Sequence, residues 1–296
     1  MRTYLECYPC FLRQALEAAR LARADENRQY WVLQGVLDEL RQFELTSTPP
    51  EMGYRIHQIV RRETGVHDPY EQAKGVSTRR ALALYPKLKA LVAEAHDPLN
   101  TAVRLSIGGN IIDLGVAQEY DLEGTIQRVL AQPFAIDAYA AFRDELARAE
   151  AVLYLADNAG ETVFDRVLIE TMNKPVTYVV KGGPILNDAT RQDALAADLN
   201  SVATIVDNGC NAPGTIITLC SQEFRYLLAE ADLIMAKGQA NYETLSETAA
   251  PIFFLLQAKC PVIARSVGVP LKSIVLKDGT LNTQRSLSTQ SGKAPV

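Results

Sequence analysis

A carboxylate and an amide stand side by side in the stretch VLYLADNAGETVFDR, residues 152–166. An apolar run leads directly into Asp157 and Asn158, and Glu161 follows shortly after them. A turn needs one Asx residue and a glycine, so local backbone geometry does not account for the whole cluster. Carboxylate and amide oxygens are the ligands that Mg²⁺ and similar hard cations take in proteins. The stretch therefore indicates an oxygen-lined metal site.

Three later apolar runs also end in polar residues with glycine. The segments that follow them are Lys181-Gly182-Gly183-Pro184 with Asn187-Asp188, Asp207-Asn208-Gly209, and Lys237-Gly238-Gln239 with Asn241. Ligands of a doubly wound sheet bind beyond the carboxyl ends of its strands, so these segments would meet at one edge. Asp157, Asn158 and Asp188 would supply oxygens to one cation. Lysines would hold an anion as point charges, and glycine-rich turns would admit backbone N–H donors. A cation, lysines and backbone N–H donors together would bind a phosphate ester.

Each of these residues also has a purely structural interpretation. Asp188 precedes a helical pattern and could be its N-cap, as Asp157 or Asn158 could be for the helix that follows them. Residues 207–209 are typical of a turn, and Lys181 alone is typical of a solvated lysine. The double glycine of KGGP is a weak phosphate signal, because the chain contains neither GxGxxG nor a Walker loop. The convergence on one sheet edge is what favours a metal and phosphate site.

One segment of the first half, SIGGNIIDLG at residues 106–115, interrupts a helical pattern with two glycines. Each glycine costs about 1 kcal/mol in a helix. Asn110 and Asp113 lie three residues apart, so both can face the same way. The purely structural interpretation is a kinked helix with two exposed polar residues. The functional one is that this helix packs over the sheet edge and adds Asn110 and Asp113 to the site.

The elements that would position these residues change character along the chain. Up to residue 148, apolar residues recur at helical spacing, including a predicted helix at 135–148. Short Val- and Ile-rich runs then alternate with helical patterns, which is typical of a doubly wound sheet. These predicted buried strands are residues 151–156, 176–180, 203–207, 232–236, 252–256 and 273–277. We expect a helical region at 1–148, a Rossmann-like, mostly parallel α/β domain at 149–280, and a polar, mobile tail at 281–296.

The bulk composition excludes several classes of protein. A length of 296 residues predicts about two domains, and 48% hydrophobic residues can fill a sizeable core. The net charge of −5 lacks the basic surplus of a nucleic-acid-binding protein. No apolar run reaches the roughly 20 residues that span a bilayer, and the first residues lack the apolar stretch of a signal peptide. We expect a cytoplasmic protein.

Five cysteines are present, and without an export signal we expect free thiols. Cys7 and Cys10 form a CxxC at a helix start, which allows half a metal site, a redox pair or two partly buried thiols. A structural zinc would need two further ligands, and no second CxxC or histidine pair occurs. The remaining cysteines are predicted core residues: Cys210, Cys220 and Cys260.

Several segments together resemble the damage-control phosphatase family, formerly catalogued as domain of unknown function eighty-nine. They are DNAGETVFDRVLIE, KGGPILNDAT, DNGCNAPGT, AKGQANYETL and GGNIIDLG, with CYPC near the N-terminus. The resemblance extends from Cys7 to about Pro261, and the CxxC is similar to the archaeal and bacterial branch. It implies a helical region followed by a Rossmann-like domain, and metal-dependent hydrolysis of small phosphate monoesters.

The resemblance also implies roles for single residues. The family's metal ligands fall on Asp157, Asn158 and Asp188. Its Gly-Asn-x-x-Asp and Lys-Gly-x-x-Asn elements fall on Asn110, Asp113, Lys237, Gly238 and Asn241. Lys181 is a weaker match, because the loop after the second strand varies between branches. Substrates also differ between branches, so the resemblance names only a small phosphorylated metabolite.

These observations define an expected mechanism. A divalent ion (Mg²⁺, Mn²⁺, Co²⁺ or Ni²⁺) would bind a phosphoryl oxygen and orient or acidify the attacking water. Lysine charge would stabilise the phosphate, and polar side chains would position its alcohol part; the predicted substrate-binding residues are Asn110, Lys181, Asn208, Lys237, Gly238 and Asn241. Asp157 or Asp113 would be the base or a nucleophile. The Asp-x-Asp motif of covalent phosphatases is absent after the first strand, which favours direct attack by water.

The sequence is also compatible with two other classes of protein. One is an S-adenosylmethionine-dependent carboxyl methyltransferase, as one family name suggests. Such enzymes usually have an acidic residue at the end of the second strand, where this chain has Lys181. The other is a metal-binding assembly protein, in which Cys7 and Cys10 gather an ion between subunits of a homo-oligomer.

Overall fold

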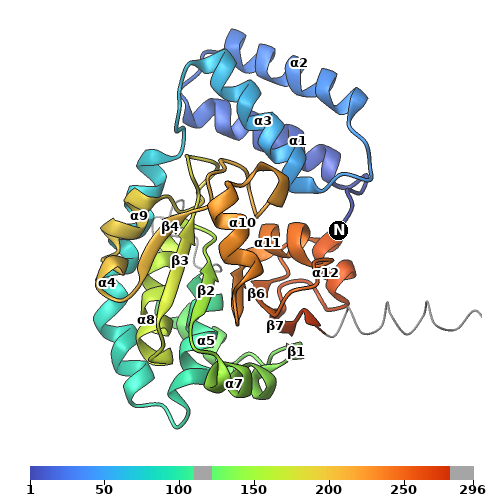
Figure 1. Cartoon of the computed structure of the whole chain (residues 1–296). Helices are drawn as coiled ribbons and strands as arrows, with labels where there is room; N and C mark the ends of the chain where they lie inside the picture. The colour runs from blue at the N-terminus through green and yellow to red at the C-terminus, as the bar shows by residue number, and fades with distance from the viewer. Residues whose placement is uncertain (110–121, 281–296) are drawn as a thin grey trace, which may run out of the picture.

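The computed structural model describes residues 1–109 and 122–280 and arranges them as helices around a central sheet (Figure 1). The helices are α1 (Cys7–Leu21), α2 (Glu26–Gln42), α3 (Pro49–Thr64), α4 (Glu71–Ala93), α5 (Pro98–Gly109), α6 (Leu122–Ala131), α7 (Tyr139–Arg148), α8 (Thr162–Met172), α9 (Arg191–Ala196), α10 (Gln222–Ala229), α11 (Gly238–Leu245) and α12 (Pro261–Val267). Short 3-10 turns are η1 (Ala159–Glu161), η2 (Leu199–Ser201) and η3 (Ile217–Leu219). The strands are β1 (Ile136–Asp137), β2 (Val152–Leu155), β3 (Val176–Val180), β4 (Thr204–Asp207), β5 (Ile234–Lys237), β6 (Ile252–Gln257) and β7 (Ile274–Asp278).

The sheet confirms the predicted Rossmann-like class. Its strand order is β1-β7-β6-β5-β2-β3-β4. Every pairing is parallel except β6 with β7. Parallel strands need crossover connections, and the helices between them supply these. All six predicted strands are present within two residues of their expected bounds. The carboxyl ends of β2 to β6 therefore lie along one edge.

Two expectations about the strands need correction. The helix predicted at 135–148 begins only at Tyr139, because residues before it form β1 beside β7. The Ala135 and Ala138 amides donate to Ile274 O at 3.0 Å and Leu276 O at 3.0 Å. A two-residue strand is too short to show a period of two, so its partner alone defines it. In addition, β4 is not covered on both faces, because it is the edge strand and is half-exposed.

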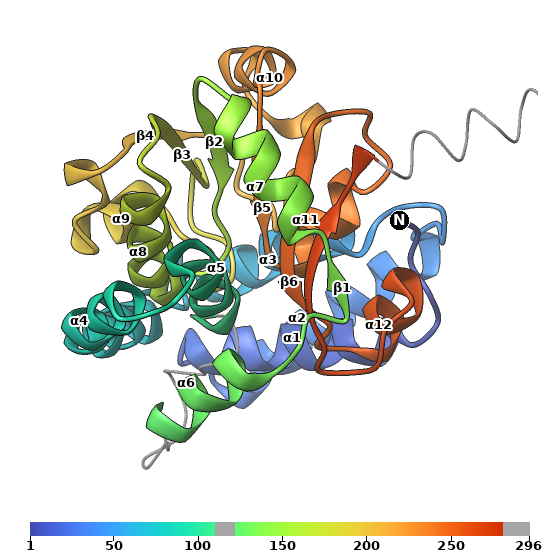
Figure 2. The same cartoon turned by 90° about the horizontal axis from the view of Figure 1, so that it is seen from below.

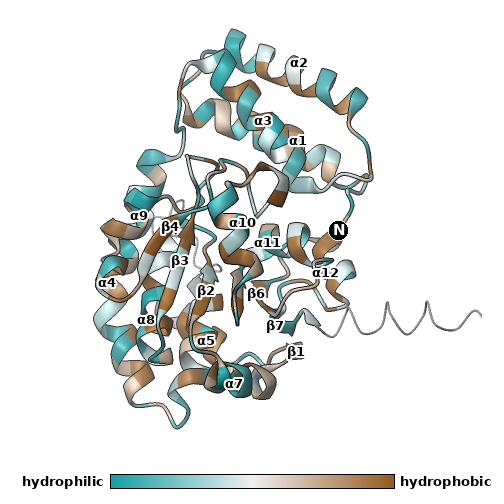
Figure 3. Ribbon diagram, in the orientation of Figure 1, coloured by the Kyte–Doolittle hydropathy of each residue, from teal (hydrophilic) through white to brown (hydrophobic). Residues whose placement is uncertain are grey.

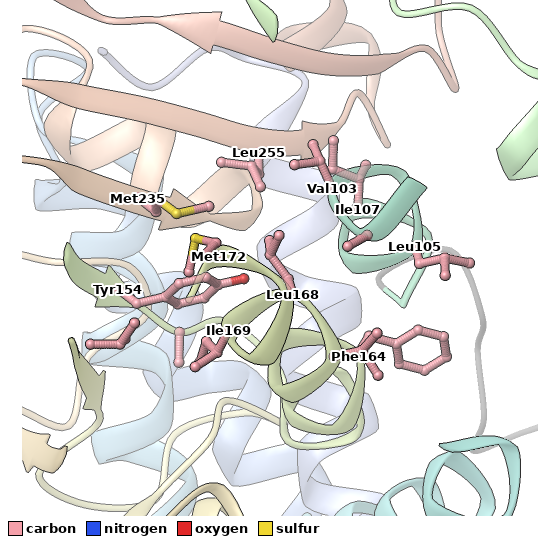
Figure 4. Packing of buried hydrophobic residues seen from close by; sticks show 14 of the residues in the cluster. Val103, Leu105, Ile107, Tyr154, Phe164, Leu168, Ile169, Met172, Met235 and Leu255 are labelled. Carbon is pink, nitrogen blue, oxygen red and sulfur yellow. The ribbon is translucent and has the colours of Figure 1, made fainter. Parts of the chain in front are cut away.

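Alternate residues of each strand enter two different cores. Tyr154, Tyr178 and Met235 pack with α4 to α9, as Figure 4 shows for Leu168 and Met172 of α8 and for α5. Their chain neighbours pack with α10 to α12, for example Leu153 and Ile234. In the view from below, the strands separate α8 from α10 (Figure 2). This two-sided covering explains why the strand sequences are almost continuously apolar.

The helices of residues 1–148 pack into two different hydrophobic cores. Helices α1 to α3 share a core of their own around Phe11 and Met52. Helices α4 to α7 instead belong to the core of the sheet, with Leu88 and Phe142 buried in it. Figure 3 shows the apolar residues concentrated on the strands, while the outer turns of α2 and α7 carry many hydrophilic ones. Within the described residues, no helix is both long and apolar enough to cross a bilayer.

Helices α1 to α3 lie against the carboxyl edge of the sheet. Arg61 of α3 donates to Pro184 O at 3.0 Å, in the loop that follows β3. Helix α3 also contacts α11, which begins directly after β5. A capping box of Thr48 and Glu51, with Pro49 at the first helical position, fixes the start of α3. The three-helix unit therefore borders the region where the candidate site residues were expected.

Because α4 packs in the core of the sheet, its buried side chains should contribute strongly to stability. Leu88 has 0% exposure in this core, so replacing it with alanine should lower the free energy of unfolding by about 2–5 kcal/mol. Leu37 of α2 is 38% exposed, and the same change there should cost roughly 0.5 kcal/mol or less. Urea unfolding followed by circular dichroism measures both. Equal effects would mean that α4 does not share the core of the sheet.

Candidate functional site

The loops after β2 and β3 are tied together by backbone hydrogen bonds. Asn158 and Asp188 form an isolated antiparallel bridge. The Ala159 amide donates to Asn187 O at 2.8 Å, and the Ala189 amide donates to Asp157 O at 2.8 Å. Three residues predicted to hold a metal are thereby brought side by side from two strand ends. Their convergence follows from parallel pairing of β2 with β3.

The Asp157 carboxylate lies directly against the start of α11. A Cβ atom on Gly238 would stand 1.9 Å from Asp157 Oδ2, and Gly238 has a positive φ of 77°. Only glycine therefore fits this position. Asn158 Nδ2 donates to Asp157 Oδ2 at 3.0 Å and also to Glu161. The Asn158 side chain is thereby held between two carboxylates.

Asp188 contains a buried acceptor that has no hydrogen bond. The residue is 3% exposed, and its Oδ2 has no hydrogen-bond partner within the described part of the chain. Lys181 Nζ lies 3.4 Å from that oxygen and forms a buried ion pair with it, which is longer than an ordinary hydrogen bond. A buried oxygen in this condition is costly unless something else binds it.

The helix-capping alternatives fail for all three residues. Thr190, not Asp188, is the N-cap of α9, where it forms a capping box with Asp193. Asn158 precedes η1 without a side-chain capping bond, and α8 likewise has none. The turn interpretation of residues 207–209 is correct, because the Gly209 amide donates to Asp207 Oδ1 at 3.1 Å.

Burial raises the pKa of each carboxylate around this point. The pKa of Asp157 is raised to about 6 by burial and by the charge of Asp188. The pKa of Asp188 is also raised to about 6, mainly by burial and against the opposing charge of Lys181. Burial raises the pKa of Glu161 to about 7, although Lys237 opposes the rise. The three acids are held close together with too little nearby positive charge, which is the environment expected of a cation site.

Lys237 lies at the centre of a buried polar network beneath these acids. Its Nζ donates to Asp165 Oδ1 at 2.7 Å, Glu161 Oε2 at 3.0 Å and Ser106 O at 2.9 Å. It has 0% exposure, and these bonds use all three of its donors. Burial lowers its pKa, but Asp165 and Glu161 raise the pKa by more. Three hydroxyl groups also donate hydrogen bonds to the Asp165 carboxylate. They belong to Ser106, Tyr154 and Tyr178.

The predicted substrate-binding amides are occupied by the protein itself. Asn241 Nδ2 donates to Ala156 O at 3.1 Å and Lys237 O at 2.8 Å, and its Oδ1 accepts from Thr215. Asn208 Oδ1 accepts from the amides of Gly182 at 3.2 Å and Cys210 at 3.0 Å. Both side chains are buried and join strand-end loops to one another. Their contact with substrate stays a prediction, whereas their positioning role is visible.

Lys181 is likewise buried, and its Nζ donates to Gly214 O. The next residue, Gly182, permits a close approach of two loops. A Cβ there would lie 2.7 Å from the Cys210 nitrogen and 2.8 Å from Gly209 Cα. The loops after β3 and β4 are therefore in backbone contact. The glycines of KGGP serve packing between loops in this structure.

The predicted residues Asn110 and Asp113 lie outside the described residues. Helix α5 ends at Gly109, immediately before them. Added Cβ atoms on Gly108 and Gly109 would lie 2.8 Å from Val129 and 2.9 Å from the Phe164 ring. The two glycines thus allow α5 to pack closely against α6 and α8. The role of Asn110 and Asp113 stays a prediction.

Two members of the buried network were not assigned from sequence. Glu161 belongs to the opening cluster, and Asp165 follows it by four residues. Residues four apart share a helix face, and Asp157 lies a further four residues back in the sequence, before the η1 turn. This spacing was the available signal. The spacing alone does not predict the burial of Asp165, which is 0% exposed. An Asp within the sequence of an amphipathic helix usually faces solvent.

The donor set around the Asn158–Asp188 bridge fits a hard divalent cation. Asp157 and Asp188 offer carboxylate oxygens, Asn158 offers its amide oxygen, and Asp188 Oδ2 is a buried acceptor that is paired with Lys181 but has no hydrogen bond within the described residues. In the part of the chain that the structure describes, no group of three or more His, Cys, Asp or Glu side chains is arranged to hold an ion. The candidate set has two carboxylates and one amide, so water would complete the coordination shell.

The CxxC motif lies beside a separate cavity of about 280 Å³. Cys7 starts α1 and is buried, Cys10 is exposed, and Cys260 is half-buried at the start of α12. All three thiols line this cavity together with Glu243 of α11. Glu243 is 8% exposed, and burial raises its pKa to about 8 against the opposing charge of the N-terminal ammonium. The predicted burial of Cys210 and Cys220 is confirmed, at 5% exposure each, whereas the same prediction is wrong for Cys260, which is only half-buried because it caps α12 beside the cavity.

Removing the buried ammonium should be severely destabilising. Lys237→Met leaves Asp165 and Glu161 without their cation, so the free energy of unfolding should fall by about 3–5 kcal/mol. Lys89 is a matched control, because its pair with Glu170 is 45% exposed on the lysine side. Lys89→Met should cost about 1 kcal/mol or less. Chemical denaturation compares the two, and equal losses would contradict a stabilising network around Lys237.

Glu243 should make stability pH-dependent. Its folded pKa of about 8 lies above the ordinary value of 4.5, so the folded state binds more protons between these two pH values and stability falls as pH rises through that window. Glu243→Gln should therefore change stability little at pH 5 and increase it by about 2–4 kcal/mol at pH 9. Glu247→Gln is the control, because Glu247 is 82% exposed. Thermal melts at both pH values decide, and a pH-independent effect of Glu243→Gln would contradict the argument.

Comparison with known proteins agrees with this architecture. The model of the damage-control phosphatase ARMT1-like domain matches residues 3–275. Damage-control phosphatases of Archaeoglobus fulgidus and Pyrococcus horikoshii are 36% and 34% identical, over 92% and 93% of this chain and 97% of each relative. The crystal structure of a DUF89 family protein from Pyrococcus horikoshii superimposes with a TM-score of 0.87 at 32% identity, covering 94% of this chain and 99% of that one. The chain therefore belongs to the damage-control phosphatase ARMT1-like family.

Proposed function

We propose that this protein is a metal-dependent phosphatase that hydrolyses small phosphate monoesters, such as sugar phosphates or damaged phosphometabolites, by attack of water. The observation that carries the proposal is the buried Asp188 Oδ2, which has no hydrogen bond within the described residues and lies across a backbone bridge from Asn158. The names of the archaeal relatives support a phosphatase.

In this proposal Asp157, Asn158 and Asp188 hold the ion, which can be Mg²⁺, Mn²⁺, Co²⁺ or Ni²⁺. When bound, such an ion polarises a phosphoryl oxygen and lowers the pKa of a coordinated water. Asn158 donates through its Nδ2 to Asp157, and its Oδ1 would be the atom that binds the ion. Asp157, or Asp113 from the segment after α5, accepts the proton of the attacking water. The substrate is a small phosphorylated metabolite.

The buried network keeps these ligands in place. Lys237 binds Glu161, Glu161 binds the Asn158 amide, and Asn158 binds Asp157. This chain of contacts fixes the side-chain orientation before any ligand arrives. Preorganised ligands cost little reorganisation during the reaction, which is the usual source of electrostatic stabilisation. Lys237 therefore acts through the ligands.

The test is turnover by the purified full chain. p-Nitrophenyl phosphate and a panel of sugar phosphates should be hydrolysed with at least one of the four metals and not after chelation with EDTA. Absence of metal-dependent turnover on every substrate would overturn the proposal. Calorimetric titration with S-adenosylmethionine runs in parallel, and binding of that cofactor would favour the methyltransferase class instead.

Substitution of the ligands should remove activity without unfolding the protein. Asp157→Asn and Asp188→Asn should each lower turnover by at least about 100-fold. Because burial raises the pKa of both carboxyls to about 6, a neutral amide should be tolerated in the metal-free fold. Asp198→Asn is the control, since Asp198 is 56% exposed and pairs with Arg166. Full activity of either ligand variant would exclude that residue from the metal site.

A further inference from the structure

The cavity of about 280 Å³ beside the CxxC motif has no part in the proposed phosphatase site. It lies where α1 and α3 meet α11 and the start of α12, and its lining is mostly apolar, with Phe11 and Val262 among its side chains. Three thiols also line it, those of Cys7, Cys10 and Cys260. A mostly apolar cavity with several thiols suits a small ligand that reacts with sulfur.

Cys7 and Cys10 are placed so that they can form a disulfide with each other. They are the first and fourth residues of α1, and residues three apart lie on the same face of a helix. Helix geometry puts two such Cα atoms about 5 Å apart, within the span of roughly 4.4–6.8 Å that a disulfide bridges. The pair can therefore close with little movement of the backbone.

The two thiols of the motif differ in their access to solvent. Cys10 is exposed, whereas Cys7 is 9% exposed and packs in the core of the three-helix unit. Burial raises the pKa of the Cys7 thiol, and the charge of Glu243 adds to that rise. An incoming reagent therefore meets Cys10 first, and Cys7 reacts readily only if a neighbouring group removes its proton.

Glu243 is a buried acid that lines the same cavity. It is 8% exposed, and no hydrogen bond or ion pair of its carboxyl group occurs within the described part of the chain. Its backbone oxygen, in contrast, accepts from the Met1 ammonium at 2.6 Å. Burial raises the pKa of Glu243 to about 8, so this carboxyl can both accept and return a proton near neutral pH.

A thiophilic metal ion is the alternative ligand, because three thiols and a carboxylate are donors that zinc takes in proteins. Within residues 1–109 and 122–280, however, no group of three or more His, Cys, Asp or Glu side chains is arranged to hold an ion. The Cys260 sulfur is instead used by the fold, since it accepts from the Ile263 amide at 3.5 Å as the N-cap of α12. The arrangement therefore favours a reaction between two thiols over coordination by three.

We propose that the Cys7–Cys10 pair exchanges with a low-molecular-weight disulfide in this cavity, with Glu243 as the general base. This activity is separate from the proposed phosphatase function and uses none of its residues. The Cys10 thiolate attacks one sulfur of the small disulfide, which joins that sulfur to Cys10 and releases the other as a thiolate. The released thiolate takes up the proton that Cys10 gave to solvent and leaves as a free thiol.

Closure of the Cys7–Cys10 bond completes the exchange. The Glu243 carboxylate accepts the Cys7 proton, and the Cys7 thiolate attacks Cys10 Sγ. The bond between Cys10 and the small sulfur compound breaks, and the departing thiolate takes the proton from Glu243. The net change oxidises the two protein thiols to one disulfide and reduces the small disulfide to two thiols. The same steps run in reverse when the oxidised chain meets an excess of small thiol.

The ionisation of Glu243 depends on groups from several elements. The charge of the N-terminal ammonium opposes the burial-driven rise of its pKa, and the charge of Asp157 adds to that rise. The other titratable or charged side chains around the cavity are Glu6, Cys7, Cys10, Arg13 and Cys260. Glu6 is itself paired with Arg265 at 2.6 Å. Glu243 therefore ionises close to the pH at which thiols react, and closure should accelerate as pH rises from 7 to 9.

Mass spectrometry of the full chain tests the exchange. The reduced protein is incubated with bis(2-hydroxyethyl) disulfide, remaining thiols are alkylated, and tryptic peptides are analysed. Trypsin leaves Cys7 and Cys10 in one peptide, residues 3–13, and Cys260 in another, residues 260–265. The wild type should lose two hydrogens in peptide 3–13 and carry no lasting adduct. Cys7→Ser should retain the mixed disulfide on Cys10, and Cys10→Ser should leave Cys7 unmodified.

Glu243→Gln tests the general base. It should slow closure by at least about 10-fold at pH 7, so that the adduct on Cys10 accumulates. The deficit should shrink at pH 9, where more of the Cys7 thiol ionises without a base. Glu247→Gln is the matched control, because Glu247 is 82% exposed and its loss should leave the rate of closure unchanged. Equal slowing by Glu243→Gln at both pH values would overturn the general-base role.

Cys260→Ser separates the proposed pair from its alternatives, because serine also caps helices. This variant should still form the Cys7–Cys10 disulfide. A wild-type crosslink between peptides 3–13 and 260–265, or a lasting adduct on Cys10, would overturn the proposal. Tight binding of one zinc ion that protects all three thiols would overturn it in favour of a metal site. Each of these results leaves the phosphatase function standing, because turnover of phosphate esters is measured separately.

Discussion

The ammonium of Lys237 between Asp165 and Glu161 is the interaction on which the rest of the site depends. It joins the end of β5 to α8 and to the η1 turn, and its third bond reaches α5 through Ser106 O. Tyr154 and Tyr178 donate to the same Asp165 from β2 and β3. Central strands and two covering helices are thus fixed by one polar cluster inside an otherwise apolar core. A partly satisfied cluster at this depth would be costly, so every member constrains the others.

Close contacts at two glycines connect this polar cluster to the loops at the carboxyl edge of the sheet. Gly238 follows Lys237 and lets the Asp157 carboxylate lie against the start of α11, where any Cβ would collide with it. Gly182 follows Lys181 and lets the loops after β3 and β4 touch through their backbones. At both positions a lysine is buried and the next residue lacks a side chain. The pairing of lysine with glycine at these strand ends therefore serves internal packing, although each segment alone resembles a phosphate-binding loop.

Much of the fold could be predicted because its signals are local. Runs such as residues 176–180 are almost continuously apolar, and parallel pairing then places the carboxyl ends of β2 to β6 at one edge. That rule was enough to bring Asp157, Asn158 and Asp188 together. Strand β1 could not be predicted, because two residues carry no periodicity and β7 alone defines it. The burial of Lys237 could not be predicted either, because a lysine at a strand end is normally solvated and only its distant partners make burial tolerable.

The same physics explains why the acids are arranged as they are. Burying Asp157, Asp188 and Glu161 raises the pKa of each, which means that the folded chain holds them in an unfavourable ionised state at neutral pH. A core optimised for stability alone would replace such a group by apolar residues or give each acid its own cation. This chain instead supplies two buried lysines for more than two buried acids. The resulting deficit of positive charge lies at the carboxyl edge of the sheet, beside Asp188 Oδ2. Under the proposed function, a cation bound at this edge would recover the free energy that this deficit costs, so the cost to the fold and the affinity for the ion would have one electrostatic origin.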